Sequence, residues 1–153
     1  MQPASYQVFT SPPLDFSPKM HAAGCYLVAQ ERILILERHP DKFQGATWGV
    51  PGGKLEPGEN PASAVVREVQ EEVGIRLSLQ QLQHLGSLYI RLPGLDYVFT
   101  IFSYYFSSTP SVELEMSEHT AFGWFLKAEA RQLNLIQGGI EALAFFEALS
   151  KKI

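Results

Sequence analysis

One stretch of the chain, residues 53–75, constrains the fold most strongly, because it joins a Gly-Pro loop to a helix with clear signals at both ends. Asn60 is a good N-cap, Pro61 suits the first helical position, and Gly74 suits the left-handed residue that follows a helix. The sequence therefore predicts a helix over residues 61–73. At about 100° per residue, its apolar side chains form one stripe that should face a core. The residues of that stripe are Ala62, Val65, Val66, Val69 and Val73.

The same helix carries a cluster of carboxylates beside its apolar stripe. Glu68, Glu71 and Glu72 are spaced i, i+3 and i+4, which places them on one face, and Arg67 lies one turn before Glu71. Hard divalent cations such as Mg²⁺ take oxygen ligands and leave several positions to water and phosphate. An ordinary exposed helix face also tolerates such a cluster, because like charges at this spacing cost only about 0.2–0.5 kcal/mol. The helix alone leaves both interpretations open.

A longer pattern around the helix favours the metal site. Gly53 is followed after five residues by Glu59, and after seven more by the segment REVQEEVGI of residues 67–75. With about 7% usage for each residue type, this pattern would arise by chance about once in a billion starting points. It resembles the signature of the Nudix (MutT-like) hydrolases at every defining position. Residues 48–54, WGVPGGK, resemble the usual approach to that signature.

The resemblance implies both a fold and an activity. The fold is an α/β Nudix α/β/α sandwich with a mixed β-sheet, which also fits strands with helices in the middle and at the end of the chain. The activity is hydrolysis of a nucleoside diphosphate linked to another moiety, by attack of water on phosphorus. The implied cofactor is Mg²⁺, with Mn²⁺ as an alternative, since bound divalent metals polarise phosphate oxygens and lower the pKa of bound water.

The resemblance also assigns site residues. The implied metal ligands are Gly52, through its carbonyl, Glu68, Glu71, Glu72 and Glu118. The implied catalytic residues are Glu71, Glu72 and Glu118, with Arg67 and Glu59 in support. Arg67 would hold a glutamate in one rotamer by a forked hydrogen bond, although an ordinary exposed ion pair is the alternative. For Gly52 the alternative is a plain tight turn after Pro51.

Glu118 is a separate assignment, because it lies outside the signature. Ser117-Glu118-His119 precedes the last expected strand, and in many Nudix relatives a glutamate in that loop is a metal ligand or general base. The alternatives are a solvated loop carboxylate and the two neighbouring candidates, Glu113 and Glu115. Whether the general base comes from the loop or the helix stays open.

Candidates for substrate binding come from four positions. Arg38 ends an apolar strand-like run, and Lys54 follows Gly53 directly. The resemblance to the Nudix sheet implies that Arg38 contacts phosphate or base and that Lys54 is similarly placed, with a surface role as the alternative. Gly53 allows close backbone approach to a ligand. His119 is a candidate for a hydrogen bond to substrate, although a lone histidine is commonly structural. Aromatic residues that could stack on a base, or belong to the core instead, are Phe43, Tyr97 and Phe99.

The most direct expectation for the substrate is a nucleoside triphosphate, cleaved to monophosphate and pyrophosphate. The alternatives are ADP-ribose, a nucleotide sugar, a dinucleotide and the 5′ end of RNA. A Nudix domain that binds a nucleotide without turnover is a different class of function. Loss of the signature glutamates would have favoured that class, and all of them are present here.

Composition limits the partners. The 153 residues are 46% apolar and 18% charged, which fits one domain with a substantial core. A net charge of −4 argues against broad affinity for nucleic acid or anionic membranes. The only cysteine, Cys25, lies in an apolar run, and we expect it to be a core residue. A single cysteine also fits a protein of a reducing compartment, and we expect the protein to be cytoplasmic. We expect no membrane association, and a monomer or a homodimer.

Residues 1–20 hold four prolines and are expected to form an N-terminal arm, followed by a single Nudix domain over residues 21–153. Alternating and apolar runs predict strands at 22–30, 33–38, 47–50, 97–106 and 121–126. The first two are expected as a hairpin or as a pair of sheet strands. Pro93-Gly94 predicts a turn. Helical spacing predicts two final helices, at 127–133 and 139–151.

Overall fold

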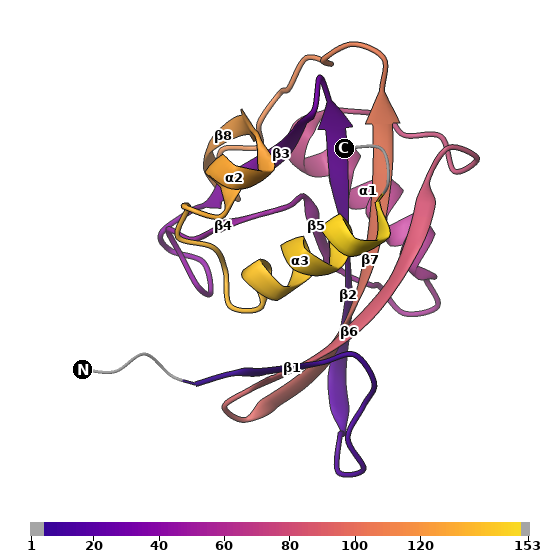
Figure 1. Cartoon of the computed structure of the whole chain (residues 1–153), viewed down its shortest axis with the longest axis vertical. Helices are drawn as coiled ribbons and strands as arrows, with labels where there is room; N and C mark the ends of the chain where they lie inside the picture. The colour runs from indigo at the N-terminus through magenta and orange to yellow at the C-terminus, as the bar shows by residue number, and fades with distance from the viewer. Residues whose placement is uncertain (1–4, 151–153) are drawn as a thin grey trace.

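The computed structural model describes residues 5–150, and a mixed β-sheet forms the centre of this part of the chain (Figure 1). The strand order is β1-β6-β7-β2-β3-β4, with β5 paired to β2 and β8 paired to β3. β2 and β7 are parallel, and the other pairs are antiparallel. The strands are β1 (Gln7–Phe9), β2 (Pro18–Ala29), β3 (Arg32–Arg38), β4 (Trp48–Gly49), β5 (Gly52–Lys54), β6 (Gln83–Leu92), β7 (Leu95–Phe106) and β8 (His119–Phe125).

Helices cover both faces of the sheet. Figure 1 shows α3 (Gly139–Leu149) in front of the sheet and α1 (Pro61–Val73) behind it. Side chains alternate along β2 accordingly, because successive residues of a strand point to opposite faces. Leu27 lies in the buried cluster under α1, and Tyr26 lies in the cluster under α3, where its ring stacks on Phe146 at 4.3 Å between centroids. The predicted α/β/α sandwich with a mixed sheet is confirmed.

α1 begins and ends where the sequence predicts. The Asn60 side chain accepts a hydrogen bond from the Ser63 N–H at 2.9 Å, and Pro61 occupies the first turn. Gly74 takes the left-handed conformation, with φ of 72°, and its N–H bonds the Gln70 carbonyl. The helix is anchored by fully buried residues that include Val65 and Val69 of the predicted stripe. Its carboxylate face is therefore fixed in direction.

β2 has one edge shared by two strands, and this arrangement creates the space for the site. Residues 22–24 pair with β5, whereas Val28 and Ala29 pair with β3. Between these two pairings the Cys25 N–H bonds the Pro51 carbonyl at 3.0 Å. β3 and β5 therefore diverge from a common strand, and the residues near their separation line a cavity. Cys25 itself is fully buried, as predicted for a core residue, and burial raises the pKa of its thiol.

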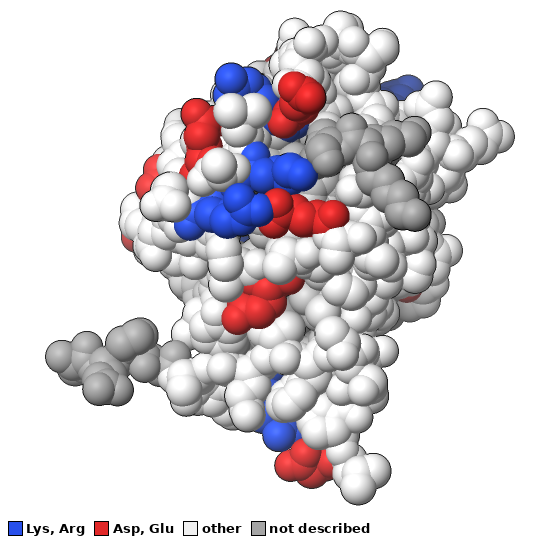
Figure 2. Space-filling model, in the orientation of Figure 1, with Lys and Arg blue, Asp and Glu red and all other residues white. Residues whose placement is uncertain are grey.

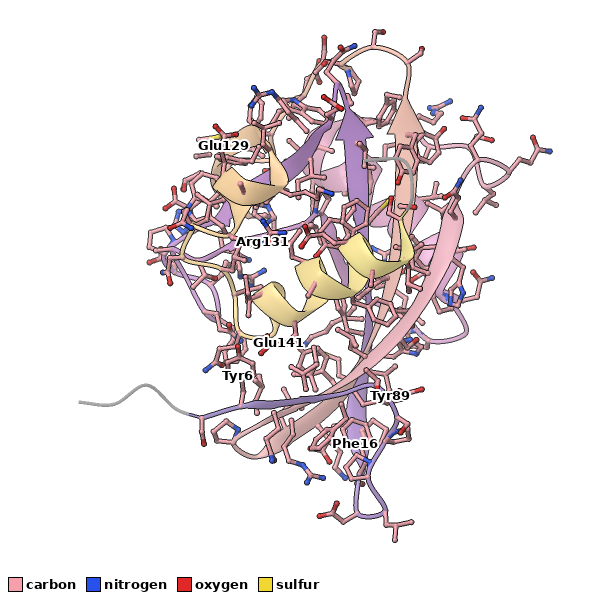
Figure 3. All side chains as sticks on the ribbon, in the orientation of Figure 1. Tyr6, Phe16, Tyr89, Glu129, Arg131 and Glu141 are labelled. Atoms are coloured by element: carbon pink, nitrogen blue, oxygen red, sulfur yellow. The ribbon has the colours of Figure 1, made fainter. Side chains whose placement is uncertain are left out.

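Residues at the start of the chain join the sheet more fully than the expected boundary at residue 20 suggests. β1 pairs with β6, and β2 already begins at Pro18. Figure 3 shows how aromatic side chains attach this segment: Phe16 meets Tyr89 edge to face, and Tyr6 reaches Glu141 at the start of α3. The Tyr6 hydroxyl donates to Glu141 at 3.0 Å. Prolines do not prevent this pairing, because they lie outside β1 or at the first position of β2.

Other boundaries differ in understandable ways. Residues 52–54 were expected as part of a loop, yet they form β5, because the free edge of β2 supplies hydrogen bonds that no side-chain pattern announces. α2 spans Lys127–Ala130 and not 127–133. The Arg131 N–H still bonds four positions back, to Lys127, but the N–H groups of Gln132 and Leu133 bond only three positions back.

The remaining predictions are confirmed in outline. The hairpin of β2 and β3, the turn at Pro93-Gly94 and the strands β7 and β8 are present. α3 ends at Leu149, and the predicted helix end at Lys151 lies outside the described residues. Within residues 5–150, no helix is long and apolar enough to cross a membrane.

Candidate active site

A cavity of about 970 Å³ lies between the signature helix, the diverging strands and the start of α3. That volume is at the upper end of the range usual for small-molecule sites. All predicted site residues except Arg67 and Glu59 line it. Those lining residues are Arg38, Gly52, Gly53, Lys54, Glu68, Glu71, Glu72, Glu118 and His119. The structure thus brings together residues that are up to 81 positions apart, from Arg38 to His119.

Glu72 is the most deeply buried carboxylate of the cavity. Only 7% of its surface is exposed, and its Oε1 accepts a hydrogen bond from the Gly52 N–H at 2.9 Å. Burial raises the pKa of Glu72 well above its usual value, the Gly52 N–H opposes this rise, and the neighbouring charge of Glu68 adds to it. A glycine is required at position 52, because a Cβ there would lie 2.2 Å from the Ala23 carbonyl oxygen. Close contact between β5 and β2 therefore holds the Glu72 carboxylate in place.

Glu68 packs against the next glycine. A Cβ on Gly53 would lie 2.6 Å from the Glu68 carboxyl carbon, so the missing side chain leaves room for the carboxylate. The pKa of Glu68 is raised, chiefly by burial, although Arg67 acts in the opposite direction. Glu71 is the most open of the three, with 54% of its side chain exposed. The three predicted carboxylates thus form a series from buried to solvent-facing along one helix face.

Arg67 lies behind the carboxylates and binds several groups at once. Its Nε and Nη2 donate to the two oxygens of Glu59, both at 2.9 Å, and Nη2 also donates to the Lys54 carbonyl at 3.1 Å. Its Nη1 donates to Glu68 at 2.7 Å and to Glu71 at 3.2 Å. The bond from Arg67 lowers the pKa of Glu59 to about 2. Arg67 is therefore far more constrained than an exposed i, i+4 pair, and it orients the carboxylates that line the cavity.

The donor atoms at this end of the cavity suit a hard divalent cation. Gly52, Glu68, Glu71 and Glu72 all line the cavity, and these four residues offer oxygen donors with no thiolate or imidazole among them. Burial raises the pKa values of Glu68 and Glu72, so a bound cation would favour the ionised form of both carboxylates. Within residues 5–150, no three Asp, Glu, His or Cys side chains are already close enough to hold a metal ion. The ligand set fits Mg²⁺ or Mn²⁺, with side-chain adjustment from the Arg67-bound positions.

The loop between β7 and β8 brings further carboxylates to α1. The N–H groups of Glu113 and Glu115 bond the carbonyls of Val73 and Glu72, each at 2.9 Å, which fixes the loop on the end of the helix. Glu113 does not line the cavity, whereas Glu115 and Glu118 do. Hydrogen bonds from Ser117 occupy Glu115 and lower its pKa.

Glu118 is therefore the loop carboxylate best placed to serve as a metal ligand or general base. Its carboxylate is 45% exposed, lies 3.5 Å from the Lys42 ammonium, and contributes to the raised pKa of Glu72 through its charge. Of the three loop candidates, it combines a cavity position with a carboxylate that no hydrogen bond within the loop occupies.

Basic and imidazole groups line the same end. Arg38 donates from Nε to the Phe43 carbonyl at 2.9 Å, so its guanidinium is held at the cavity by the loop of residues 39–46. His119 is 4% exposed, and burial, followed by the charge of Arg38, lowers its pKa to about 4. Its Nδ1 is buried with no hydrogen-bond partner among the described residues. His119 is thus a neutral ring under the site, and Lys54 is an exposed cation at its edge.

The other end of the cavity is apolar and aromatic. Phe99, Tyr97, Ile90 and Leu143 line it, together with Trp48, whose ring packs edge to face on Phe125. Burial raises the pKa of the Tyr97 hydroxyl to about 12. Of the three aromatic residues expected to stack on a base or to join the core, Phe43 is 66% exposed at the cavity, while Tyr97 and Phe99 are partly buried in its wall.

One wall of the apolar end was absent from the sequence predictions. Residues 135–139 are held on β4 by two hydrogen bonds of 2.9 Å, from the Trp48 N–H to the Asn134 carbonyl and from the Ile136 N–H to the Trp48 carbonyl. Gln44 adds a third link, because its side chain accepts from the Gln137 N–H at 2.8 Å. Local sequence gives no signal for these contacts, since each joins segments more than 80 positions apart.

Comparison with known proteins places this site in a family. The profile of the NUDIX domain family matches residues 18–146. A CTP pyrophosphohydrolase of Escherichia coli (strain K12) is 31% identical over 77% of this chain and 84% of its own length. An octanoyltransferase of Myxococcus xanthus is 34% identical over 76% of this chain, and the match spans only 34% of that relative's length.

Solved structures agree with the profile match. The crystal structure of a MutT NUDIX hydrolase from Burkholderia pseudomallei superposes with a TM-score of 0.71 and 27% identity. The match covers 82% of this chain and 95% of that one. The signature glutamates, their burial and their shared cavity agree with this assignment. The chain therefore belongs to the Nudix (MutT-like) family of hydrolases.

Proposed function

We propose that the protein hydrolyses a nucleoside triphosphate to the monophosphate and pyrophosphate, with Mg²⁺ as the cofactor and Mn²⁺ as a functional substitute. The observation that carries this proposal is the shared cavity: carboxylates line one end, and aromatic and apolar side chains line the other. A nucleotide has the same division, because a charged phosphate chain is joined to a flat, largely apolar ring. The match to a CTP pyrophosphohydrolase over most of both chains supports a triphosphate substrate.

The residues proposed to hold the metal are Gly52, Glu68, Glu71, Glu72 and Glu118. When bound there, a divalent ion neutralises charge on phosphate oxygens and makes a bound water more acidic. Glu72 is fixed by the Gly52 N–H, and Glu68 by Arg67, so these two carboxylates are oriented before substrate arrives. Glu59 positions Arg67 from behind. This arrangement avoids the cost of reorganising the site during reaction.

Proton transfer is assigned to a carboxylate near the open end of the cavity. A general base must be free to accept a proton and be within reach of the attacking water. Glu118 meets the first condition, because among residues 5–150 the Lys42 ammonium, at 3.5 Å, is the only hydrogen-bond or ion-pair partner of its carboxylate. Glu71, whose oxygens share Arg67 with Glu68, is the candidate from the helix. We favour Glu118 as the base.

Phosphate and base binding follow from the same division. Arg38 and Lys54 supply positive charge at the carboxylate end, and Gly53 allows the phosphate chain to approach the backbone. His119 lies under this end as a neutral ring that can hydrogen-bond to substrate after a small side-chain movement. At the apolar end, Phe43 is available to stack on the base.

The proposal extends to the compartment, the domain organisation and the assembly of the protein. We propose a cytoplasmic enzyme, because a single reduced Cys25 fits a reducing compartment. We keep residues 21–153 as one Nudix domain with residues 1–20 as an attached arm, and a monomer or a homodimer as the assembly. Figure 2 shows basic and acidic side chains interspersed on the face that carries α2 and α3, without a broad basic surface there. That distribution argues against long RNA as a ligand.

The test is a turnover assay with Mg²⁺ or Mn²⁺ against nucleoside triphosphates, ADP-ribose, nucleotide sugars, dinucleotides and RNA with a 5′-triphosphate. Phosphate and pyrophosphate are measured separately, with and without added inorganic pyrophosphatase. The proposal expects pyrophosphate and monophosphate from at least one triphosphate, and no turnover after removal of the metal by EDTA.

Two results would overturn the proposal in different ways. Turnover restricted to ADP-ribose, a nucleotide sugar, a dinucleotide or RNA would replace the substrate and keep the chemistry. No turnover of any compound, with nucleotides still raising the melting temperature, would indicate a nucleotide-binding domain without catalysis.

A further inference from the structure

Gln44 has an unusual backbone conformation at the wall of the cavity. Its φ is 55°, in the left-handed region that non-glycine residues rarely adopt, and Ala46 in the same loop has φ of 62°. The conformation is held locally, because the Gln44 carbonyl accepts a hydrogen bond from the Thr47 hydroxyl at 2.6 Å. Strained backbone of this kind persists where the surroundings fix it, and it is concentrated at functional sites.

The orientation of the Gln44 carboxamide follows from its partner. The Gln137 N–H can only donate, so the atom 2.8 Å from it must be the amide oxygen, Oε1. The amide nitrogen is therefore directed elsewhere, and within residues 5–150 no hydrogen bond occupies it. Gln44 is partly exposed and lines the cavity. The loop thus presents two N–H donors that have no hydrogen-bond partner in the described part of the chain.

The position of Gln44 places these two N–H donors where the base of a bound nucleotide is expected, and not where its phosphates are expected. Its side chain contacts the segment that forms the apolar wall, where a Cβ on Gly138 would lie 3.2 Å from Ile90. The signature carboxylates are carried by α1, and Glu72 is held by β5 through the Gly52 N–H. A neutral amide among apolar side chains suits a hydrogen bond to the edge of a base, and such a bond also fixes the orientation of the base in the cavity.

We propose that Gln44 selects the base of the nucleotide by donating from Nε2 to an exocyclic carbonyl oxygen, which favours guanine, uracil and thymine over adenine and cytosine. This inference rests on the proposed function, because it requires a nucleoside triphosphate in the cavity. An exocyclic amino group in the same position would place donor against donor and leave both unpaired. A site built around a hydrogen bond discriminates strongly against a ligand that cannot make it.

Gln44→Glu separates this role from a structural one. The glutamate keeps an oxygen for the Gln137 N–H and replaces the Nε2 donor by a second acceptor. Because added negative charge lowers the affinity for every nucleotide, the readout is the ratio of kcat/KM values for GTP over ATP and for UTP over CTP. We expect ratios of about ten or more in the unchanged protein and a fall of about tenfold or more in Gln44→Glu.

Two further variants complete the experiment. Gln44→Met removes both donor and acceptor at similar size, and its ratios should approach one. Gln132→Glu places the same charge on an exposed residue that does not line the cavity, and its ratios should equal those of the unchanged protein. Melting temperatures of all variants show whether each protein folds.

The outcomes distinguish base selection by Gln44 from the proposed hydrolysis of nucleoside triphosphates. Triphosphate turnover with ratios that Gln44→Glu and Gln44→Met leave unchanged would overturn base selection by Gln44 and keep the proposed function. An equal loss for all four nucleotides would show that Gln44 only supports the loop, and would also overturn the inference. Absence of triphosphate turnover in the unchanged protein would overturn both.

Discussion

The Gly52 N–H donates to the Glu72 carboxylate across 2.9 Å, and so connects β5 to the most buried acidic side chain of the signature helix. Glu72→Gln and Glu71→Gln test whether these carboxylates bind the metal. In Glu72→Gln the amide oxygen still accepts from Gly52, so the fold should remain while kcat/KM falls by about 100-fold or more. The measurements are steady-state kinetics with Mg²⁺ and thermal melting.

The matched control for these two variants is Glu31→Gln, which makes the same change at the exposed turn between β2 and β3. Its turnover should equal that of the unchanged protein. Near-normal turnover in both Glu71→Gln and Glu72→Gln would contradict their assignment as ligands.

Arg67→Lys tests whether the Arg67 guanidinium positions the carboxylates that line the cavity. Lysine keeps the charge but cannot bind Glu59 with two parallel N–H groups while also reaching Glu68. We expect the Mg²⁺ concentration for half-maximal rate to rise by about 10–100-fold, together with a lower melting temperature. Arg131→Lys, at the exposed ion pair with Glu147, is the control. A lower melting temperature with unchanged Mg²⁺ dependence would indicate a purely structural role.

Glu118→Gln tests the loop carboxylate against its neighbours. A lost general base slows turnover by about 100-fold or more, and the exposed side chain should leave the melting temperature unchanged. Glu113→Gln alters the same loop away from the cavity and should keep full activity. If Glu118→Gln turns over normally and Glu115→Gln does not, the assignment moves to Glu115.

Phe43→Ala tests stacking at the exposed rim of the apolar end. Stacking of a base on an aromatic ring contributes about 1–3 kcal/mol, so KM should rise by about tenfold with little change in kcat. Phe43→Tyr keeps a flat ring and should restore the original KM. Leu14→Ala removes an exposed apolar side chain that does not line the cavity, and serves as the control. An unchanged KM in Phe43→Ala would exclude stacking there.

Asp96 gives the fold a defined dependence on acid. Hydrogen bonds from Arg91 and from the Ser17 N–H lower the pKa of Asp96 to about 2, below its value in an unfolded chain. A carboxylate with a lowered folded-state pKa stabilises the fold fully above its unfolded pKa, near 4, and loses that effect as pH falls through about 2. Asp96→Asn should therefore lower the melting temperature at pH 7.

The difference in melting temperature should shrink between about pH 4 and pH 2, which a pH series of melting curves measures. Asp41→Asn is the control, because its side chain is 88% exposed and its weak partner is His39. A difference between Asp96→Asn and the unchanged protein that is constant down to pH 2 would contradict the role of the charged carboxylate.

Local signals explain which parts of the molecule were predictable. The bounds of α1 follow from residues within one helix, Asn60, Pro61 and Gly74, and each makes its expected contact. The carboxylate end of the cavity follows from that helix and the glycines before it. β5 did not follow, because Gly52 and Gly53 have no side chains to form a strand pattern and the free edge of β2 decides their pairing.

The apolar end was less predictable for a related reason. Its wall at residues 135–139 is held by backbone hydrogen bonds to Trp48. The local sequence around either partner gives no signal that predicts this pairing. The donor role of Gln44 depends on a positive φ and on the Gln137 N–H, which only the folded chain reveals. Phe43 could be named from the sequence as a stacking candidate, but its exposure at the rim required the tertiary structure.

The contact between Tyr6 and Glu141 extends the influence of the chain's beginning beyond β1 (Figure 3). Glu141 lies in the first turn of α3, directly after the segment that walls the apolar end of the cavity. A version of the chain that lacks Tyr6 loses this hydrogen bond to the helix that follows the cavity wall. Its kinetic constants therefore describe a protein in which the attachment of α3 is altered.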